Sequence, residues 1–553
     1  MTTAGSVERT SVLIVGAGPV GLSLAIELGQ RGVGCIVLER NLREGTTPRA
    51  KTTHVRTREH LRRWGIAKDL AAASPLGIDY PSDIVFVTRL AGYKLAEFKN
   101  AFHCAPGRNE LYSEHAQWIP QYILEQVLRS HAQRLPGVQL RFGCEFLEAT
   151  EADGCVTSRY RDVQRQTELS IASDYLVGAD GARSLVRSLI GARMEGKYGL
   201  SRNHNFVFRA PGLARAHAHG PAIMYWQVNP DLPSLIGPMD VDDTWYFMPT
   251  RLPDGVKLTS ADAGAAIRRA TGVELDVEVL RSDEWVASEL IADRYRSGRV
   301  FLAGDACHLH PPFGGYGMNM GIADAVDLGW KLSAVIQGWG GSRLLDSYTL
   351  ERRPTHELVI AEAVANHATL ADAFWAVGLD SADEQGARLR AAVGERIIKS
   401  KAREFHNLGC VLGYRYADSP VIVPGEGEPP VFDSGRYVPS AYPGCLAPHA
   451  WIDADVSLYD TFGRGFTLLT GHGASASGVA RAERDARDAG IQLQTVALHD
   501  PQLEALYRKA YTLVRPDQHV AWQGDEGPGA AVLRAVTGRP SPPDSGSSGG
   551  RIR

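Results

Sequence analysis

The chain has 553 residues, 44% of them hydrophobic and 22% charged, which is enough for several domains with buried cores. Its net charge of −4 gives no reason to expect a nucleic-acid partner. Seven scattered cysteines without a CxxC pair argue against a disulfide framework and a zinc site. Because there is no apolar run of about 18 residues and no secretory signal pattern, we expect a cytoplasmic protein without a membrane span.

The N-terminal segment has the pattern of a βαβ unit. Residues 11–15 (SVLIV) predict a strand that stops at the glycine-rich segment 16–21 (GAGPVG), and residues 35–39 (CIVLE) predict a second strand after a helix. Glycines here allow a tight turn and let a pyrophosphate reach the helix N-terminus, while an acidic residue after the second strand can bind ribose hydroxyls. We predict a site for FAD or NAD, rather than NADP, formed by Gly16, Gly18, Pro19, Gly21, Glu39 and Arg40.

A second strand–turn–helix pattern lies at residues 175–187 (YLVGADGARSLVR). The predicted strand delivers Asp180 and Gly181 to the start of a short helix. Taken alone, this pattern fits either a ligand-binding turn or a structural turn in which Ser184 caps the helix.

Residues 200–290 have a different texture. Short strand-like pieces alternate with Pro, Gly and Asp turns, which predicts a mainly antiparallel sheet. Its aromatic residues could line a substrate pocket or pack in a core, and strand alternation allows at most one of each adjacent pair to face a pocket. The candidates for the pocket are Tyr225, Trp226, Trp245 and Tyr246.

The third motif, residues 304–332, follows a strand at 299–304 (RVFLAG). Gly304 and Asp305 end that strand, and the Asp305 carboxylate is placed to accept hydrogen bonds from a sugar or ribityl chain. A proline- and glycine-rich loop leads to a helix, whose first N–H groups would point at a ligand. Such a helix N-terminus would stabilise the anion of a reduced flavin by about 0.3–2 kcal/mol. We expect these N–H groups to come from Gly317, Met318 and Asn319.

The same loop contains Cys307, His308 and His310. The two histidines could suggest a metal pair, but no third ligand with suitable spacing is visible, so we predict no metal site. Cys307 is interpreted as a small packing residue rather than a redox centre.

The C-terminal part predicts a separate small α/β domain. Residues 350–405 are rich in helix formers, and after Gly425 strand-like and helix-like segments alternate, for example GFTLLTG (465–471) and PQLEALYRKA (501–510). The end of the chain is rich in Pro, Ser and Gly, which is typical of a disordered tail.

In this order and spacing, the three motifs resemble the p-hydroxybenzoate hydroxylase-fold family of single-component flavoprotein monooxygenases. The resemblance covers about residues 10–365. It implies that GxGxxG binds the ADP part of FAD, that Asp180 and Gly181 contact FAD and NAD(P)H, and that Asp305 contacts the riboflavin part. It further implies three roles: Arg49 in TPRAKTTHVRT (47–57) reaches the isoalloxazine, Gln121 contacts FAD, and the Pro312 carbonyl faces the hydroxylation site.

The C-terminal segments PGCLAPHAWID (443–453) and LVRPDQHVAW (513–522) resemble the thioredoxin-like domain of phenol and polyketide hydroxylases. Because this domain has no CxxC, we expect a structural or oligomerisation role, with a homodimer as one option. The expected fold is α/β, with a Rossmann-like FAD-binding domain, a mainly antiparallel substrate domain and this third domain. The predicted boundaries are 1–190 with 300–370 for FAD, where part of 75–120 could join the substrate domain, then 191–299 for the substrate, 371–424 as a helical connection, 425–536 and a tail at 537–553.

The resemblance implies an aromatic hydroxylase, of the kind used in the catabolism of aromatic compounds. In this chemistry NAD(P)H reduces FAD, O2 adds at flavin C4a, and the hydroperoxide delivers one oxygen atom to an electron-rich ring. The expected substrate is a small aromatic, phenolic compound. Three alternatives stay open: a polycyclic polyketide or antibiotic substrate, a flavin-dependent dehydrogenase or oxidase, and a non-catalytic flavin carrier.

Overall fold

The computed structural model describes residues 7–42, 50–250, 252 and 258–540. The predicted tail lies outside the described residues from 541 onward. The chain forms two compact units. Unit 1 contains the residues up to Val326 together with Arg353–Gly413 and Phe432–Tyr437, and unit 2 contains Asp327–Arg352, Tyr414–Val431 and the residues from Val438. None of the described helices is long and apolar enough to cross a membrane.

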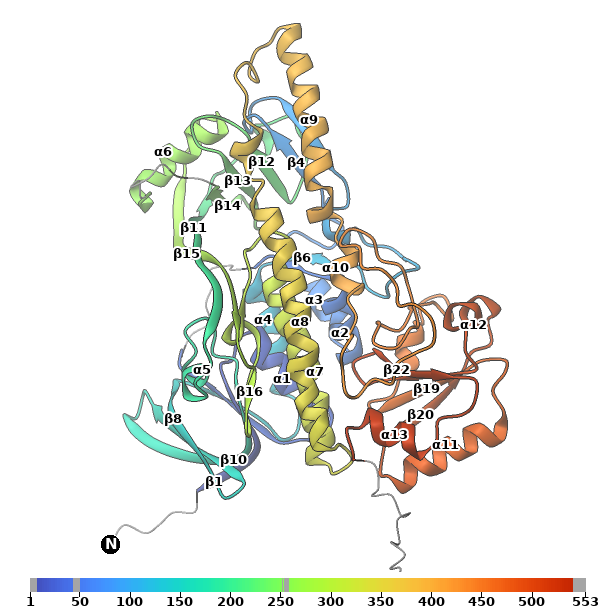
Figure 1. The fold of residues 1–553 in the computed structure, drawn as a ribbon. Coiled ribbons are helices and arrows are strands. Elements are labelled where there is room, and N and C mark those ends of the chain that lie inside the picture. Colours follow the sequence, from blue (N-terminus) through green and yellow to red (C-terminus); the bar gives the residue numbers. More distant parts are fainter. Residues whose placement is uncertain (1–6, 43–49, 251, 253–257, 541–553) are drawn as a thin grey trace, which may run out of the picture. The chain divides into compact units, whose positions relative to one another are not determined.

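The first sheet of unit 1 is the expected Rossmann-like sheet (Figure 1). Its strand order is β16-β17-β10-β1-β2-β7, and β1 pairs in parallel with both β2 and β10. The chain leaves β1 through α1 to β2 on one side, while β10 lies on the other, so the order reverses at the end of β1, where open α/β sheets bind ligands. The elements are β1 (Glu8–Val15), α1 (Pro19–Gln30), β2 (Cys35–Glu39), β7 (Val138–Phe142), β8 (Cys144–Ala152), β9 (Cys155–Asp162), β10 (Thr167–Gly178), β16 (Arg296–Ser297) and β17 (Val300–Leu302).

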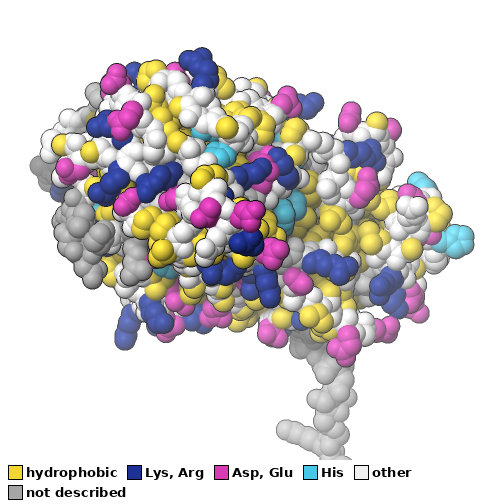
Figure 2. Space-filling view, turned by 90° about the horizontal axis from the view of Figure 1, so that it is seen from above, with side chains coloured by type: hydrophobic (Ala, Val, Ile, Leu, Met, Phe, Trp, Pro, Cys, Tyr) yellow, Lys and Arg dark blue, Asp and Glu magenta, His cyan; other side chains and the backbone are white. Residues whose placement is uncertain are grey.

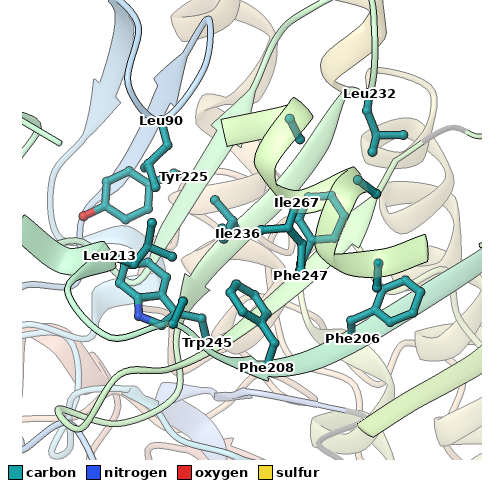
Figure 3. Packing of buried hydrophobic residues seen from close by; sticks show 14 of the residues in the cluster. Leu90, Phe206, Phe208, Leu213, Tyr225, Leu232, Ile236, Trp245, Phe247 and Ile267 are labelled. Atoms are coloured by element: carbon teal, nitrogen blue, oxygen red, sulfur yellow. The ribbon is translucent and has the colours of Figure 1, made fainter. Parts of the chain in front are cut away.

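The second sheet of unit 1 is mainly antiparallel, as predicted, with the order β18-β15-β11-β14-β13-β12-β4-β5. Only β12 and β4 pair in parallel. One face packs under helix α6 (Ser260–Thr271), where alternate apolar residues form a core (Figure 3). The strands are β4 (Ile84–Val87), β5 (Lys94–Phe98), β11 (Met194–Arg209), β12 (Met224–Gln227), β13 (Ser234–Pro238), β14 (Thr244–Pro249), β15 (Glu278–Ala292) and β18 (His308–Leu309).

The remaining elements of unit 1 connect these sheets. A two-stranded ladder joins β3 (Thr52–Thr53) to β6 (Gln117–Trp118). Two long helices, α7 (Tyr316–Ile336) and α8 (Ser342–His367), each contribute residues to both units. The other helices of unit 1 are α2 (Val55–Trp64), α3 (Ala67–Ala72), α4 (Gln121–Ala132), α5 (Leu185–Leu189), α9 (Glu384–Phe405) and α10 (Leu408–Leu412).

Unit 2 contains a four-stranded sheet of order β20-β19-β21-β22 with helices against it (Figure 1). β19 and β20 are parallel and the other pairs are antiparallel, so the α/β alternation read from the sequence forms one mixed sheet. Its elements are β19 (Phe466–Thr470), α11 (Ala476–Asp488), β20 (Leu493–Ala497), α12 (Pro501–Tyr507), β21 (Tyr511–Val514), β22 (Val520–Gly524) and α13 (Ala530–Val536).

The visible face in Figure 2 mixes basic, acidic and hydrophobic side chains. Interspersed charges of both signs produce no extended single-sign field on this face.

Glu27 is a buried charge that ties α1 to α2. Its carboxylate accepts hydrogen bonds from Arg31 at 2.8 Å, Arg63 at 2.8 and 3.0 Å and the Trp64 indole at 2.8 Å. Burial alone raises the pKa of Glu27, but the guanidinium groups of Arg63 and Arg31 outweigh it and lower this pKa from 4.5 to about 2.

This arrangement predicts a specific acid sensitivity. Because the folded-state pKa of Glu27 lies below the unfolded value, the carboxylate stabilises the fold above about pH 4.5, and this stability is lost as the pH falls towards about 2. Glu27→Gln should lower the free energy of unfolding by about 3 kcal/mol at neutral pH. It should also make this free energy fall less steeply as the pH decreases below about 4.5. Urea unfolding from about pH 2 to 7 checks this, with the exposed Glu148→Gln as control. Parallel pH curves for wild type and Glu27→Gln would contradict the assignment.

Candidate active site

The three sequence motifs meet at the carboxyl ends of the parallel strands. Gly16 follows β1 with φ +105°, and a Cβ there would lie 2.3 Å from the Ala179 carbonyl oxygen, so the first motif touches the second. A Cβ on Gly304 would lie 2.7 Å from the Val20 side chain, so the third motif touches the first. Arg187, the last residue of the second motif, donates to the Ala306 carbonyl in the third motif at 3.0 Å. Segments about 120 and 160 residues apart in sequence thus share one edge of the sheet.

The glycines of the first motif have different reasons to be glycine. A Cβ on Gly21 would lie 1.9 Å from the Gly16 carbonyl oxygen, so Gly21 is required by the chain's own packing. A Cβ on Gly18 would meet nothing within 4 Å, and its φ of −75° suits any residue. Gly18 precedes Pro19, the first residue of α1. The protein leaves open the space in front of this helix N-terminus, which fits the pyrophosphate of a dinucleotide.

The acidic residue that ends β2 is anchored to the glycine-rich turn. Glu39 Oε2 accepts a hydrogen bond from the Ala17 N–H at 3.0 Å, and Oε1 accepts from the Asn41 N–H at 2.9 Å. The next residue, Arg40, is exposed. The carboxylate is therefore held beside the first motif, within reach of a ribose bound there.

The second motif has the structural role that the sequence left open, and one unused polar atom. Asp180 Oδ2 accepts hydrogen bonds from the Leu185 and Val186 N–H groups at 2.7 and 3.2 Å, and Ser184 Oγ accepts from the Arg187 N–H at 2.9 Å, so both cap α5. Gly181 turns the chain with φ +79°. Asp180 Oδ1 is buried without a hydrogen-bond partner among the described residues. A buried carboxylate oxygen of this kind fits a ligand hydroxyl.

The third motif rests on a buried network that the sequence reading missed. The Gly304 N–H donates to Asp324 Oδ2 at 3.0 Å, while Asp305 beside it is exposed. Asp324 also accepts from the imidazoles of His308 and His356, both at 3.0 Å, and none of these three side chains is exposed. The Tyr295 hydroxyl donates to His356 Nδ1 at 2.7 Å. The signal available in the sequence was an aspartate within the apolar helix pattern after Gly317.

Cys307 also lies in this network, and its thiol, His308 and Asp324 present ligand atoms within 4.8 Å of one another. The hydrogen bond between His308 and Asp324 accounts for their closeness. The two loop histidines that could suggest a metal pair, His308 and His310, have ring centroids 4.8 Å apart.

Asp324→Asn is expected to weaken FAD binding at least about tenfold, because an amide has one acceptor oxygen where the carboxylate serves three N–H donors. The Gly304 turn should then lose its fixed position. FAD affinity by fluorescence titration checks this, with Glu357→Gln on the exposed side of α8 as control. If Asp324→Asn bound FAD like the control, the network would have no role in holding the turn.

At the start of α7, the Asn319 side chain is fully used by the protein. It accepts from the His54 N–H at 2.9 Å and the Thr57 hydroxyl at 2.7 Å, and it donates to the Thr52 carbonyl at 2.9 Å. Contacts of this helix start to a cofactor are therefore left to backbone N–H groups. Gly317 and Met318 are half-buried, and a Cβ on Gly317 would meet nothing within 4 Å.

Of three other predicted residues, Pro312 and Gln121 lie in the described part of the chain and Arg49 does not. The exposed Pro312 has a carbonyl that accepts a hydrogen bond from the Gly315 N–H at 3.0 Å. Gln121 begins α4, where its side chain donates to Glu125 at 2.7 Å. Arg49 lies outside the described residues.

Strand alternation separates the four aromatic candidates. Figure 3 shows Tyr225 and Trp245 within the core under α6. Trp226 stacks on Phe86 with centroids 5.1 Å apart, in an aromatic cluster of the opposite face. Tyr246 donates its hydroxyl to the Ile223 carbonyl at 3.2 Å, and its ring lies 6.4 Å from the Trp118 ring. Two of the four rings also face an ammonium group: Lys51 lies over the Tyr246 ring and Lys401 lies over the Trp226 ring.

Comparisons with known proteins agree with this geometry. A family model described as an FAD binding domain matches residues 9–363, and the model for the C-terminal region of aromatic-ring hydroxylases matches residues 440–540. The chain is 33% identical to a 4-methyl-5-nitrocatechol 5-monooxygenase from a Burkholderia species, over 95% of this chain and 97% of that protein. It is 31% identical to a putative polyketide hydroxylase from Streptomyces halstedii, over 94% of each.

The similarity extends to solved structures. RebC, a rebeccamycin biosynthetic enzyme solved with bound 7-carboxy-K252c, superimposes with a TM-score of 0.89 at 34% identity, over 96% of this chain and 100% of that chain. The predicted α/β fold and the predicted FAD cofactor are both confirmed. The chain therefore belongs to the p-hydroxybenzoate hydroxylase-fold family, and it is an FAD-dependent aromatic hydroxylase, a flavoprotein monooxygenase.

Proposed function

We propose that this enzyme hydroxylates a small phenolic compound, using NAD(P)H as electron donor and O2 as the source of one oxygen atom. The observation that carries the proposal is the convergence of the three motifs around open space at Gly18 and at Gly317, near the start of α7. Beside it lies an aromatic wall, formed by the rings of Tyr246 and Trp118. The relative named for a nitrocatechol supports a phenolic substrate. A polycyclic polyketide is the second candidate, which the relative named as a polyketide hydroxylase favours.

The proposed roles combine the geometry of the three motifs with the family resemblance, which alone suggests the roles of Arg49, Gln121 and Pro312. Gly16, Gly18, Pro19 and Gly21 hold the pyrophosphate, Glu39 binds ribose, and Arg40 lies at the exposed rim of that site. The Asp180 carboxylate with Gly181, the turn of Gly304 and Asp305, and the Gln121 side chain bind the remaining FAD. The N–H groups of Gly317, Met318 and Asn319 face the flavin ring, Arg49 reaches that ring, and the Pro312 carbonyl faces the substrate.

When bound, FAD supplies the electron transfer and the oxygen chemistry. The chain's own contribution is to orient the two rings, exclude water and stabilise negative charge. α7 presents the positive end of a 21-residue helix to the ring, which favours its anionic reduced form. The rings of Tyr246 and Trp118, tilted by 42° to each other, form an aromatic wall that would offer an apolar surface for a substrate ring.

The nicotinamide is proposed to bind transiently near Asp180, because the chain has one GxGxxG motif and FAD uses it. We further propose a structural role for the C-terminal domain, a cytoplasmic location and a homodimer. Light scattering during gel filtration tests the dimer.

The decisive experiment measures oxygen transfer by the purified holoenzyme. NADH or NADPH oxidation should accelerate with the right phenol, and the product should gain one oxygen atom that carries the label of ¹⁸O2. A panel that contains simple phenols, catechols and polycyclic hydroxyquinones separates the two substrate classes. If a substrate reduces the flavin directly under argon, without NAD(P)H, the enzyme is a dehydrogenase and the proposal is wrong.

A further inference from the structure

Lys51 lies between the start of α7 and the second sheet of unit 1. Its carbonyl accepts a hydrogen bond from the Ile119 N–H at 2.7 Å, and the neighbouring Thr52 carbonyl accepts from the Asn319 side chain at 2.9 Å. These bonds hold the backbone beside the helix that faces the flavin. The side chain extends to β14, where the ammonium lies 4.2 Å from the centroid of the Tyr246 ring.

This ammonium has an aromatic neighbour but no acidic one. Among the residues that the structure describes, no carboxylate forms an ion pair with Lys51. The two fully buried lysines differ in this respect: Lys401 binds Glu404 at 2.7 Å, and Lys331 binds Asp327 at 2.8 Å. Lys51 is half-buried, and desolvation of its ammonium lowers its pKa from 10.5 to about 8. A desolvated charge without a counter-ion is costly, so such a charge is often completed by a ligand.

We propose that Lys51 binds the oxyanion of the aromatic substrate, a phenolate or carboxylate, and thereby selects ionised ligands. This inference rests on the proposed function. The Tyr246 ring lies beside the Lys51 ammonium, with the Trp118 ring tilted by 42° to it, and the Tyr246 hydroxyl is already bound to the Ile223 carbonyl. Lys51 is therefore a cation available to a ring oxygen beside the Tyr246 ring.

The pairing of the Lys51 ammonium with a phenolate also suits the proposed hydroxylation. A phenolate is more electron-rich than the neutral phenol, so it reacts more readily with an electrophilic oxygen. When a neutral phenol binds as the phenolate, its proton passes to solvent and the oxyanion remains against the ammonium. Lys51 would thus hold the reactive form of the substrate in place.

The test compares two ligands of nearly the same shape on the holoenzyme. 2,4-Dinitrophenol is ionised at neutral pH, while its methyl ether, 2,4-dinitroanisole, cannot ionise. Equilibrium dialysis should show that the wild type prefers the phenolate about tenfold, the ratio expected for one partly desolvated ion pair. Lys51→Met should lose this preference and keep its affinity for the ether. Lys51→Arg should restore it, and the exposed Lys197→Met should leave it unchanged.

The pH profile provides a second readout. Wild-type affinity for 2,4-dinitrophenol should fall as the pH rises through about 8, because the ammonium loses its proton there, and Lys51→Arg should stay flat. The neighbouring titratable groups do not change charge in this range: burial raises the pKa of Tyr246 well above 10 and lowers the pKa of His54 to about 4.

Each outcome decides the point. If the wild type shows no preference for the phenolate, or if Lys51→Met retains one, the assignment of Lys51 is wrong, even where NAD(P)H-dependent hydroxylation is intact. If the preference depends on Lys51 but no oxygen is transferred to any phenol, the anion site stands and the proposed function fails. Flavin content and circular dichroism of each variant establish that it is folded.

Discussion

Gly18→Ala should leave the protein folded and remove most of its FAD. An alanine here meets no atom of the chain within 4 Å and is compatible with φ −75°, so the native packing can accommodate it. The methyl group would instead occupy the space where the pyrophosphate approaches the start of α1. We expect FAD affinity to fall at least about 100-fold, or roughly 2.7 kcal/mol.

Flavin absorbance of the purified variant and FAD titration of the apoprotein measure this effect. Gly21→Ala is the informative contrast, because its Cβ would lie 1.9 Å from the Gly16 carbonyl oxygen and should disturb the fold itself. Gly529→Ala, which also meets nothing within 4 Å but lies at the start of α13, is the matched control. A yellow Gly18→Ala protein with wild-type affinity would show that the phosphates bind elsewhere.

Arg515→Met should destabilise unit 2 by about 3–5 kcal/mol, because it leaves buried carboxylates without their main counter-ion. The Arg515 side chain is completely buried and donates to Glu351 at 2.7 and 2.8 Å, to Asp327 at 2.9 Å and to Asp517 at 2.6 Å. Lys331 binds Asp327 and Glu351 as well. Burial raises the pKa of Glu351, but Arg515 and Lys331 outweigh it and lower this pKa to about 2.

Thermal and urea unfolding measure the loss, with the exposed Arg484→Met on α11 as control. Arg515→Lys should recover only part of the stability, because an ammonium cannot form the paired hydrogen bonds of a guanidinium with Glu351. If Arg515→Met unfolded at the same denaturant concentration as the control, the network would contribute nothing measurable.

The sequence alone determined the features whose physical cause is local. The spacing of the glycines between a strand and a helix predicted the dinucleotide turn, because Gly21 packs against the nearby Gly16 carbonyl and Gly18 leaves room for a ligand. The contact of Gly16 with the distant Ala179 carbonyl appears only in the folded chain. Strand-like pieces between turn residues predicted the antiparallel sheet, because short turns between strands are also determined by neighbouring residues. Asn319 was predicted to lie at the start of a helix, and it lies in the first turn of α7, which begins at Tyr316.

Other features depend on residues that are distant in sequence, and only the tertiary structure decided them. Asp324 acquires its role from His308 and His356, and the charge of Arg515 is balanced by carboxylates as far as 188 positions away. Which face of β12 and β14 is covered depends on the helices packed there, so no pattern could separate Tyr246 from Tyr225. No local pattern in the sequence distinguishes Lys51 from a surface lysine. The desolvation of its ammonium and the neighbouring Tyr246 ring exist only because folding brings Lys51, next to β3, to a ring on β14, and burial, unlike periodicity, is a property of the whole chain.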